Sequence, residues 1–97
     1  MHPEIRLRLY VTGRSTRSER AVSHVSELKD ERFGLACSIE IVDALERPDL
    51  AELDRIIATP TLLRVLPKPE MRIIGDLASG DAIVSALDLE RAEANDA

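Results

Sequence analysis

The sequence predicts a single α/β domain whose elements follow in the order βαβαββα around a four-stranded mixed sheet. Three observations point to this fold class. Apolar and polar residues alternate over 5–11, apolar residues recur at helical spacing over 16–28, and two strand-like runs, 61–66 and 71–75, flank a turn at 67–70. The helix between the first two strands makes that pair parallel, through a right-handed crossover.

Length and composition suit one domain covering residues 1–97, ordered over about 5–90 and flexible in the polar tail 91–97. Hydrophobic residues make up 44% of the chain, but Phe33 and Tyr10 are its only aromatic residues, so aliphatic side chains must form the core. The formal net charge of −5 argues against non-specific binding of nucleic acids, which requires a basic surface.

The first strand and helix have clear local signals. The apolar face of the strand consists of Ile5, Leu7, Leu9 and Val11. Gly13 ends the strand, and Thr16 with Glu19 has the spacing of a capping box at the start of the helix. Gly34 is a suitable left-handed stop for that helix.

The second strand is expected over Leu35 to Asp43, with Leu35, Cys37, Ile39 and Ile41 on its apolar face. Because the first two strands are parallel, we expect Arg8 and Glu40 to be cross-strand neighbours on a partly solvated face. Cys37 lies on the apolar face, which indicates a buried, inert thiol. A single cysteine cannot form a disulfide within the chain, and this favours a cytoplasmic protein.

Two more helices are expected. Pro48 suits the first position of one, which should continue to about Ala58 because Thr59 precedes Pro60 and is biased away from helix. Its apolar side, expected to face inward, consists of Leu50, Leu53, Ile56 and Ile57. The last helix is expected over Asp81 to Arg91. Its inward-facing residues are expected to be Ile83, Ala86 and Leu87.

Sites for metals, nucleotides and membranes find little support. His2 and His24 are isolated histidines without ligand-spaced carboxylates, and the loop 13–19 lacks the second glycine and the lysine of a phosphate-binding loop. Asp43 is interpreted as a residue of the turn that ends a strand. No run approaches the ~18 apolar residues of a membrane span, and the N-terminus does not have the pattern of a signal peptide. We therefore expect no cofactor, no metal, no membrane association and no enzymatic activity.

The segment Ile57-Ala58-Thr59-Pro60-Thr61-Leu62 resembles that of thioredoxin-like chains, in which a proline opens a strand, is cis and faces the active site. Those enzymes also carry a pair of cysteines at the start of the first helix. The matching stretch here, Gly13-Arg14-Ser15-Thr16-Arg17-Ser18, has no thiol. The resemblance implies a thioredoxin-like fold that serves for binding, with a candidate cis bond between Thr59 and Pro60.

A second resemblance covers nearly the whole chain. The motifs together are similar to the KaiB family, small clock proteins of bacteria. They run in order over about residues 5–89 and consist of Leu7-Arg8-Leu9-Tyr10-Val11-Thr12-Gly13, Ser18, Ile41-Val42-Asp43, Pro48-Asp49-Leu50-Ala51, Ala58-Thr59-Pro60-Thr61-Leu62, Leu66-Pro67 and Arg72-Ile73-Ile74-Gly75-Asp76-Leu77.

The KaiB resemblance implies two alternative folds and a set of partners. One fold is a tetrameric ground state with the order βαββααβ, so a homodimer or homotetramer is open for that state. The other is a thioredoxin-like monomer that binds KaiC, a hexameric RecA-fold ATPase. In cyanobacteria that complex captures KaiA on the exposed second strand. The implied function is therefore that of a non-catalytic regulatory binding protein in a circadian or hourglass timing system.

Two departures from the family pattern affect these expectations. Ala86-Leu87-Asp88 stands where the family often has Gly-Leu-Asp, and alanine favours helix over glycine by about 1 kcal/mol. Ala86 and Asp88 therefore bear on the fold balance and lean it toward the thioredoxin-like state, with Gly80 partly offsetting this. Glu40 replaces a basic residue of the KaiA-binding edge, which makes KaiA a doubtful partner.

The resemblance and the expected exposure give a set of candidate partner contacts, namely Gly13, Arg14, Arg17, Ser18, Glu40, Arg55, Thr59 and Pro60. Two alternative functions remain open. One is a thioredoxin- or glutathione-type redox enzyme, which the missing active-loop cysteine disfavours because the thiolate is the nucleophile. The other is a KaiB-like adaptor for a different RecA-like ATPase in stress signalling.

Overall fold

The computed structural model describes residues 4–75 and 79–90, so the tail at 91–97, expected to be flexible, lies outside the described ranges. The elements are β1 (Ile5–Val11), α1 (Thr16–Leu28), β2 (Cys37–Asp43), α2 (Pro48–Leu53), β3 (Thr61–Leu66), β4 (Met71–Ile74) and α3 (Gly80–Ala86). This order confirms the predicted α/β class with the sequence βαβαββα. It is the thioredoxin-like arrangement rather than the alternative order βαββααβ.

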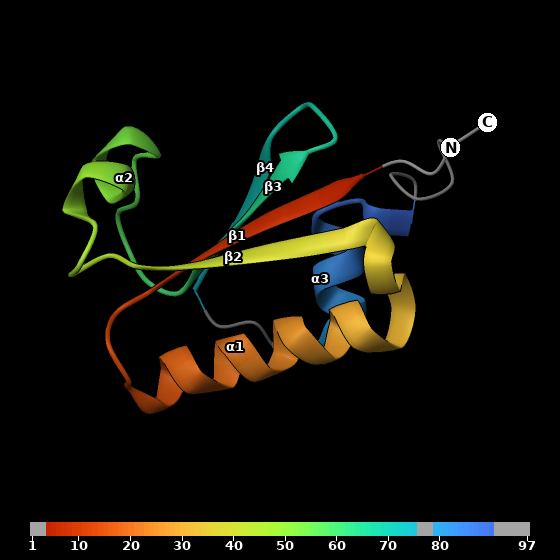
Figure 1. Ribbon diagram of the computed structural model, residues 1–97, viewed down its shortest axis with the longest axis horizontal. Helices are drawn as coiled ribbons and strands as arrows, with labels where there is room; N and C mark the ends of the chain where they lie inside the picture. The colour runs from red at the N-terminus through yellow and green to blue at the C-terminus, as the bar shows by residue number, and fades with distance from the viewer. Residues whose placement is uncertain (1–3, 76–78, 91–97) are drawn as a thin grey trace.

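The sheet has the strand order β2-β1-β3-β4 (Figure 1). Strands β1 and β2 are parallel, whereas β3 runs antiparallel to both β1 and β4. Arg8 lies directly opposite Glu40 in the register of β1 and β2, and Arg8 Nε donates to Glu40 Oε1 at 2.7 Å. The expected cross-strand pair is confirmed.

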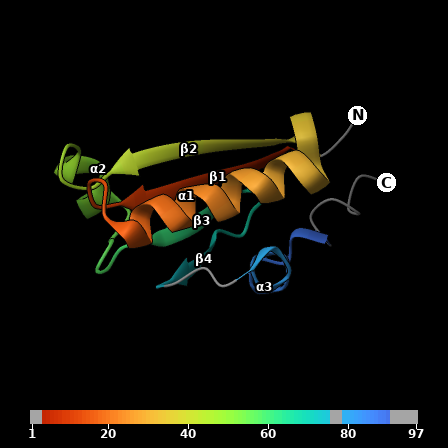
Figure 2. The ribbon, with the colours of Figure 1, turned by 90° about the horizontal axis from the view of Figure 1, so that it is seen from below.

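Helices α1 and α3 cover one face of the sheet, and α2 lies at the end where β1 and β2 finish (Figures 1 and 2). The main core fills the space between the sheet and these two helices, and its fully buried members include Leu7, Leu9, Val25, Leu62, Ile83 and Leu87. A smaller cluster lies on the other face, where Tyr10, Val42 and Leu63 pack against the partly buried Leu50 and Ile56.

Helix α1 begins one residue differently from the prediction. Ser15, not Thr16, is the N-cap, because it keeps an extended backbone and its Oγ accepts from the amide of Ser18 at 3.1 Å. Thr16 is already helical. After Leu28 the chain continues as a π-helical turn, Lys29–Phe33, and Gly34 ends it with a φ of +53°, as expected of a glycine at a helix end.

Strand β2 is shorter than predicted. It begins at Cys37, because residues 34–36 form a 3₁₀ turn in which Leu35 is fully exposed. Ile41 is half exposed because β2 is an edge strand, so only part of the predicted apolar face is buried. Cys37 is buried, as predicted, and Asp43 Oδ1 accepts from the amide of Leu45 at 2.9 Å, which confirms its role in a turn.

Helix α2 ends at Leu53, so the prediction that it continues to Ala58 is wrong. The amide of Ile56 donates to the carbonyl of Ala51 at 2.8 Å, and that of Arg55 donates to the carbonyl of Glu52 at 3.0 Å. Together with the φ of +55° at Arg55, these bonds form a Schellman motif that ends the helix. The signal was missed because this position usually carries glycine.

Helix α3 ends at Ala86, because Asp88 has a φ of +53°, and the predicted end of the last helix at Arg91 lies outside the described residues. Ala86 is exposed, so the prediction that it faces inward is wrong, whereas Ile83 and Leu87 are buried as expected. Ser79 caps the start of the helix by accepting from the amide of Ala82 at 3.2 Å. Residues 80–86 are helical, as in the thioredoxin-like arrangement, and the expected lean of the fold balance stays a prediction.

Candidate functional site

Two of the predicted contact segments meet at one end of the sheet. The loop after β1 turns at Gly13, where φ is +57°, and the turn before β3 contains a cis bond between Thr59 and Pro60. Thr12 Oγ1 lies 2.6 Å from Thr59 Oγ1, so a hydrogen bond between the two hydroxyl groups joins the loop to the turn. The structure therefore brings these segments together, as the thioredoxin-like resemblance implied.

The interior of this loop is held by hydroxyl groups. Ser18 is only 3% exposed, and its Oγ accepts from the amide of Thr12 at 3.1 Å and donates to the carbonyl of Thr12 at 3.2 Å. Ser15 Oγ donates to Ser18 Oγ at 2.9 Å. Ser18 and the buried Pro60 shape the loop and turn from within, so the expectation that both are exposed is wrong.

Three other candidates do lie at the surface. Arg14 and Arg17 are exposed on the loop and the first turn of α1. Glu40 is exposed on the edge strand β2, where Arg8 holds its carboxylate. A shallow groove of about 470 Å³ runs between α1 and β2, and its apolar floor includes Val22 and Ile41.

Leu53, Arg55 and Ile57 form a second exposed area, which we call the α2 surface. Leu53 is 74% exposed and Ile57 is 84% exposed, although the sequence pattern predicted both to face inward. The left-handed turn at Arg55 explains the exposure of Ile57, because it redirects the chain before that residue, whereas Leu53 is exposed within the helix itself. Two large apolar side chains, with a cationic residue between them in the sequence, are thus open to solvent.

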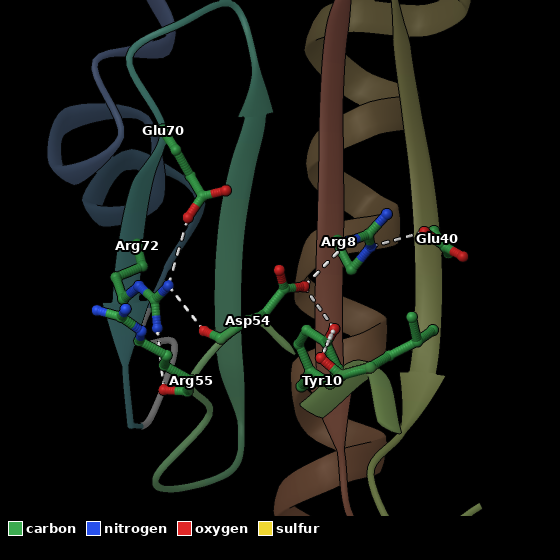
Figure 3. A network of polar contacts seen from close by, with 8 residues as sticks. Arg8, Tyr10, Glu40, Asp54, Arg55, Glu70 and Arg72 are labelled. Carbon is green, nitrogen blue, oxygen red and sulfur yellow. Dashed lines mark hydrogen bonds and ion pairs between the residues drawn. The ribbon is translucent and has the colours of Figure 1, made fainter. Parts of the chain in front are cut away.

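A polar network lies on the sheet face beside α2 (Figure 3). Asp54 Oδ2 accepts from Arg8 Nη1 at 2.9 Å and from the hydroxyl of Tyr10 at 2.5 Å. Burial alone would raise the pKa of Asp54, but the hydrogen bonds from Tyr10 and Arg8 outweigh it and hold that pKa below its usual value. Asp54 is therefore a carboxylate at neutral pH.

The same network changes the titration of its other two members. Burial and the hydrogen bond to Asp54 raise the pKa of Tyr10 to about 12. The hydrogen bond to Glu40, followed by the contact with Asp54, raises the pKa of Arg8 despite its partial burial.

Arg72 extends the network from β4 to the end of α2. Its Nη2 donates to the carbonyl oxygen of Asp54 at 2.9 Å, and its Nη1 donates to that of Arg55 at 3.3 Å (Figure 3). Sequence reasoning missed Tyr10, Asp54 and Arg72 as a group. One signal was available. Tyr10 occupies a polar position of the alternation in β1, and a tyrosine hydroxyl that is buried there needs a hydrogen-bond partner.

The two fold-balance candidates lie elsewhere. Ala86 and Asp88 stand at the end of α3, which covers the opposite face of the sheet from the smaller apolar cluster (Figure 2). They are not brought together with the loop, the turn or the α2 surface.

Metal and thiol chemistry have little basis in the described ranges. Among residues 4–75 and 79–90, no three histidine, cysteine or acidic side chains gather as a metal site would require. None of the helices described there is long and apolar enough to cross a membrane. Burial raises the pKa of the Cys37 thiol to about 11, which leaves very little thiolate at neutral pH.

Comparison with known protein families gives a match over most of the chain. The family model described as the KaiB domain matches residues 8–89. The circadian clock protein KaiB3 of Synechocystis is 42% identical over 83 residues, which are 86% of this chain and 81% of that protein. The circadian clock oscillator protein KaiB of Trichodesmium erythraeum is 40% identical over 90 residues, which are 93% of this chain and 86% of that protein.

Comparison with solved structures supports the fold. The N-terminal domain of SasA from Synechococcus elongatus superposes with a TM-score of 0.67 at 20% identity, covering 93% of this chain and 82% of that one. Mitochondrial thioredoxin 3 from Saccharomyces cerevisiae gives a TM-score of 0.70 at 17% identity, covering 89% of this chain and 78% of that one. These identities are low, so the likeness concerns the fold alone.

Proposed function

The chain belongs to the KaiB family of circadian clock proteins, and from that membership we propose that it is a regulatory binding protein that docks on a KaiC-like RecA-fold ATPase. Such docking would place it in a circadian or hourglass timing system. The observation that carries the proposal is the α2 surface, where Leu53 and Ile57 are exposed on either side of Arg55.

The composition of the α2 surface suits a protein partner. A single exposed apolar side chain is ordinary on a protein surface. Burial of both Leu53 and Ile57 in one interface would remove a large apolar area from water and so stabilise a complex. Arg55 between them supplies a charge that steers the encounter and fixes the register of the complex. The nearby turn at Thr59 and the exposed Arg14 and Arg17 extend this proposed contact area.

The thiol chemistry of the chain favours regulation by binding over catalysis. The loop over residues 13–18, which resembles the thioredoxin active-site loop in its place in the chain, contains no cysteine, and Cys37 is buried with a raised pKa. A thiol-dependent redox reaction would need an exposed thiolate in that loop. Glu40 also remains an argument against KaiA, since a basic residue is usual on that edge in the family and Arg8 already pairs with it.

A binding experiment with matched variants tests the proposal. The KaiC-like ATPase of the same organism is mixed with the wild-type chain in ATP and in ADP, and complex formation is followed by size-exclusion chromatography together with the ATPase rate. We expect a complex in at least one nucleotide state. Leu53→Ala and Ile57→Ala should each weaken it by about tenfold or more, as truncation of a central apolar contact does.

Leu35→Ala is the matched control, because Leu35 is fully exposed at the opposite end of β2 from α2. It should leave the affinity unchanged. Absence of a complex in both nucleotide states would overturn the proposal. An equal loss with Leu35→Ala would show that the α2 surface is not where the partner binds. Binding to a different RecA-like ATPase instead would favour the adaptor function in stress signalling.

A further inference from the structure

Helix α2 is weakly held by its own apolar contacts. None of its six residues is buried, and a helix of this length is not stable by itself. Leu50 and Ala51, with Ile56 just beyond the helix, are only partly buried against the smaller apolar cluster. Since Leu53 faces solvent, other interactions must fix the place of α2 on the sheet.

The turn that follows α2 also needs support. Arg55 adopts a left-handed conformation at the position of the Schellman motif that glycine usually occupies. A side chain with a Cβ atom disfavours that conformation, so the surrounding structure must hold it. The direction of the chain at Ile57, two residues further on, depends on this turn.

Three side chains of the sheet donate hydrogen bonds to the chain at the end of α2. Arg8 and Tyr10, both on β1, donate to the same carboxylate oxygen of Asp54, whose side chain is 14% exposed. The hydroxyl of Tyr10 also lies 3.0 Å from the carbonyl oxygen of Leu50. Arg72 binds the carbonyl oxygens of Asp54 and Arg55 from β4. The contacts therefore meet at the last turn of α2, between the two apolar residues of the α2 surface.

We propose that Asp54 is a positioning residue for partner docking, whose carboxylate ties the end of α2 to β1 and so presents Leu53, Arg55 and Ile57 in a fixed arrangement. The expected effect on partner affinity rests on the proposed function. The expected effect on the order of the turn does not. A surface that is already ordered loses less conformational freedom on binding, so its affinity is higher than that of the same residues on a mobile turn.

Removal of the carboxylate should leave the fold intact, because each donor has another acceptor within reach. Arg8 also binds Glu40, and the hydroxyl of Tyr10 can donate to the Leu50 carbonyl instead. No charge is therefore left buried without a partner in the Asp54→Ala variant. This property makes the variant suitable as a test.

The experiment measures hydrogen exchange and partner affinity in the same variants. In Asp54→Ala we expect the amides of residues 54–56 to exchange about tenfold faster or more, while those of β1 and β3 keep their rates. The affinity for the KaiC-like ATPase should fall by about tenfold, through the lost preorganisation. Asp54→Asn, which keeps an acceptor oxygen but no charge, should lie between this variant and the wild type.

Asp49→Ala is the matched control. It removes an exposed carboxylate from the same helix, where Asp49 pairs only with the neighbouring Arg47 among its described ion pairs. Neither exchange at 54–56 nor affinity should change in this variant.

The outcomes separate the two proposals. Failure of the wild-type chain to bind the ATPase counts against the proposed function, whereas unchanged exchange at residues 54–56 in Asp54→Ala overturns the positioning role. Loss of affinity without faster exchange would mean that Asp54 touches the partner directly, which also overturns it. Faster exchange with full affinity would show that the order of this turn does not matter for docking, and this would also overturn the positioning role.

Discussion

Arg64, on β3, donates from Nη1 to the carbonyl oxygen of Leu87, 2.8 Å away at the C-terminal end of α3. Its Nη2 donates to the carbonyl oxygen of Pro69 at 2.7 Å, in the turn between β3 and β4. The side chain is only 4% exposed, and within the described residues its Nε has no acceptor. Carbonyl groups at a helix C-terminus carry partial negative charge, so one buried cation joins the helix, the turn and the strand.

Replacement of Arg64 should therefore loosen α3. We expect Arg64→Met to lower the free energy of unfolding by about 1–3 kcal/mol, because two charge-assisted hydrogen bonds are lost. Arg64→Lys should lose a similar amount, since an ammonium group lacks the fork that reaches both carbonyls. Urea unfolding followed by circular dichroism measures both values. A lysine variant as stable as the wild type would show that charge alone suffices.

Tyr10 should titrate well above free tyrosine. Its pKa is raised from 10.0 to about 12, so the folded state keeps a proton that the unfolded state loses. Stability from this group is therefore present below pH 10 and falls by about 1.4 kcal/mol per pH unit as the pH rises from 10 toward 12.

The titration can be followed directly, because Tyr10 is the only tyrosine and the chain has no tryptophan. At pH 11 we expect the phenolate absorbance to remain small in the folded protein, whereas free tyrosine is then about nine-tenths ionised. Circular dichroism at the same pH verifies that the fold persists. The Tyr10→Phe variant should lose less stability between pH 10 and pH 12 than the wild type, and the loss that remains includes that of the Cys37 thiol, whose pKa is also raised. A normal tyrosine titration in the folded wild type would contradict the network around Asp54.

Local patterns predicted the parts of this fold that local physics determines. The alternation in β1 fixed its faces, and the parallel pairing then placed Arg8 opposite Glu40. The end of α2 escaped prediction, because the helical spacing of apolar residues continues to Ile57 while Arg55 adopts a conformation usual for glycine. That conformation is supported by Arg72, whose partners are 17 and 18 residues away in sequence.

The candidate site was likewise predictable only in part. Spacing and resemblance identified the loop at Gly13 and the turn at Thr59, and the hydroxyl contact between Thr12 and Thr59 joins them. Burial of Ser18 was not predictable, because a serine in a helix start is usually a solvated cap. The pair of Tyr10 and Asp54 is separated by 44 residues, and no local pattern relates them.

Cys37 should react poorly with thiol reagents in the native protein. Burial raises the pKa of its thiol from 9.0 to about 11, which lowers the thiolate fraction at pH 8 by about a hundredfold. We expect labelling by a disulfide reagent at pH 8 to be at least about 100-fold slower in buffer than in urea. Rapid stoichiometric labelling of the folded chain would instead reopen the redox alternative.

The end of α3 offers a matched pair of substitutions that bear on the fold balance. Asp88 has a φ of +53°, a conformation that glycine adopts freely and alanine does not. Asp88→Gly should therefore keep or raise the stability of the described fold, and Asp88→Ala should be less stable than Asp88→Gly by about 1 kcal/mol. Ala86→Gly, at the exposed last position of the helix, should lower stability by up to about 1 kcal/mol.

Urea unfolding gives the order of these three variants, and hydrogen exchange at residues 80–86 shows whether α3 itself responds. Faster exchange confined to those amides is expected for Ala86→Gly and Asp88→Ala, because the amide of Asp88 closes the last turn on the carbonyl of Ser85 at 3.2 Å. If Asp88→Gly were the least stable of the three, the aspartate side chain rather than the left-handed backbone would decide how this helix ends, and the fold balance would have to be assigned to other residues.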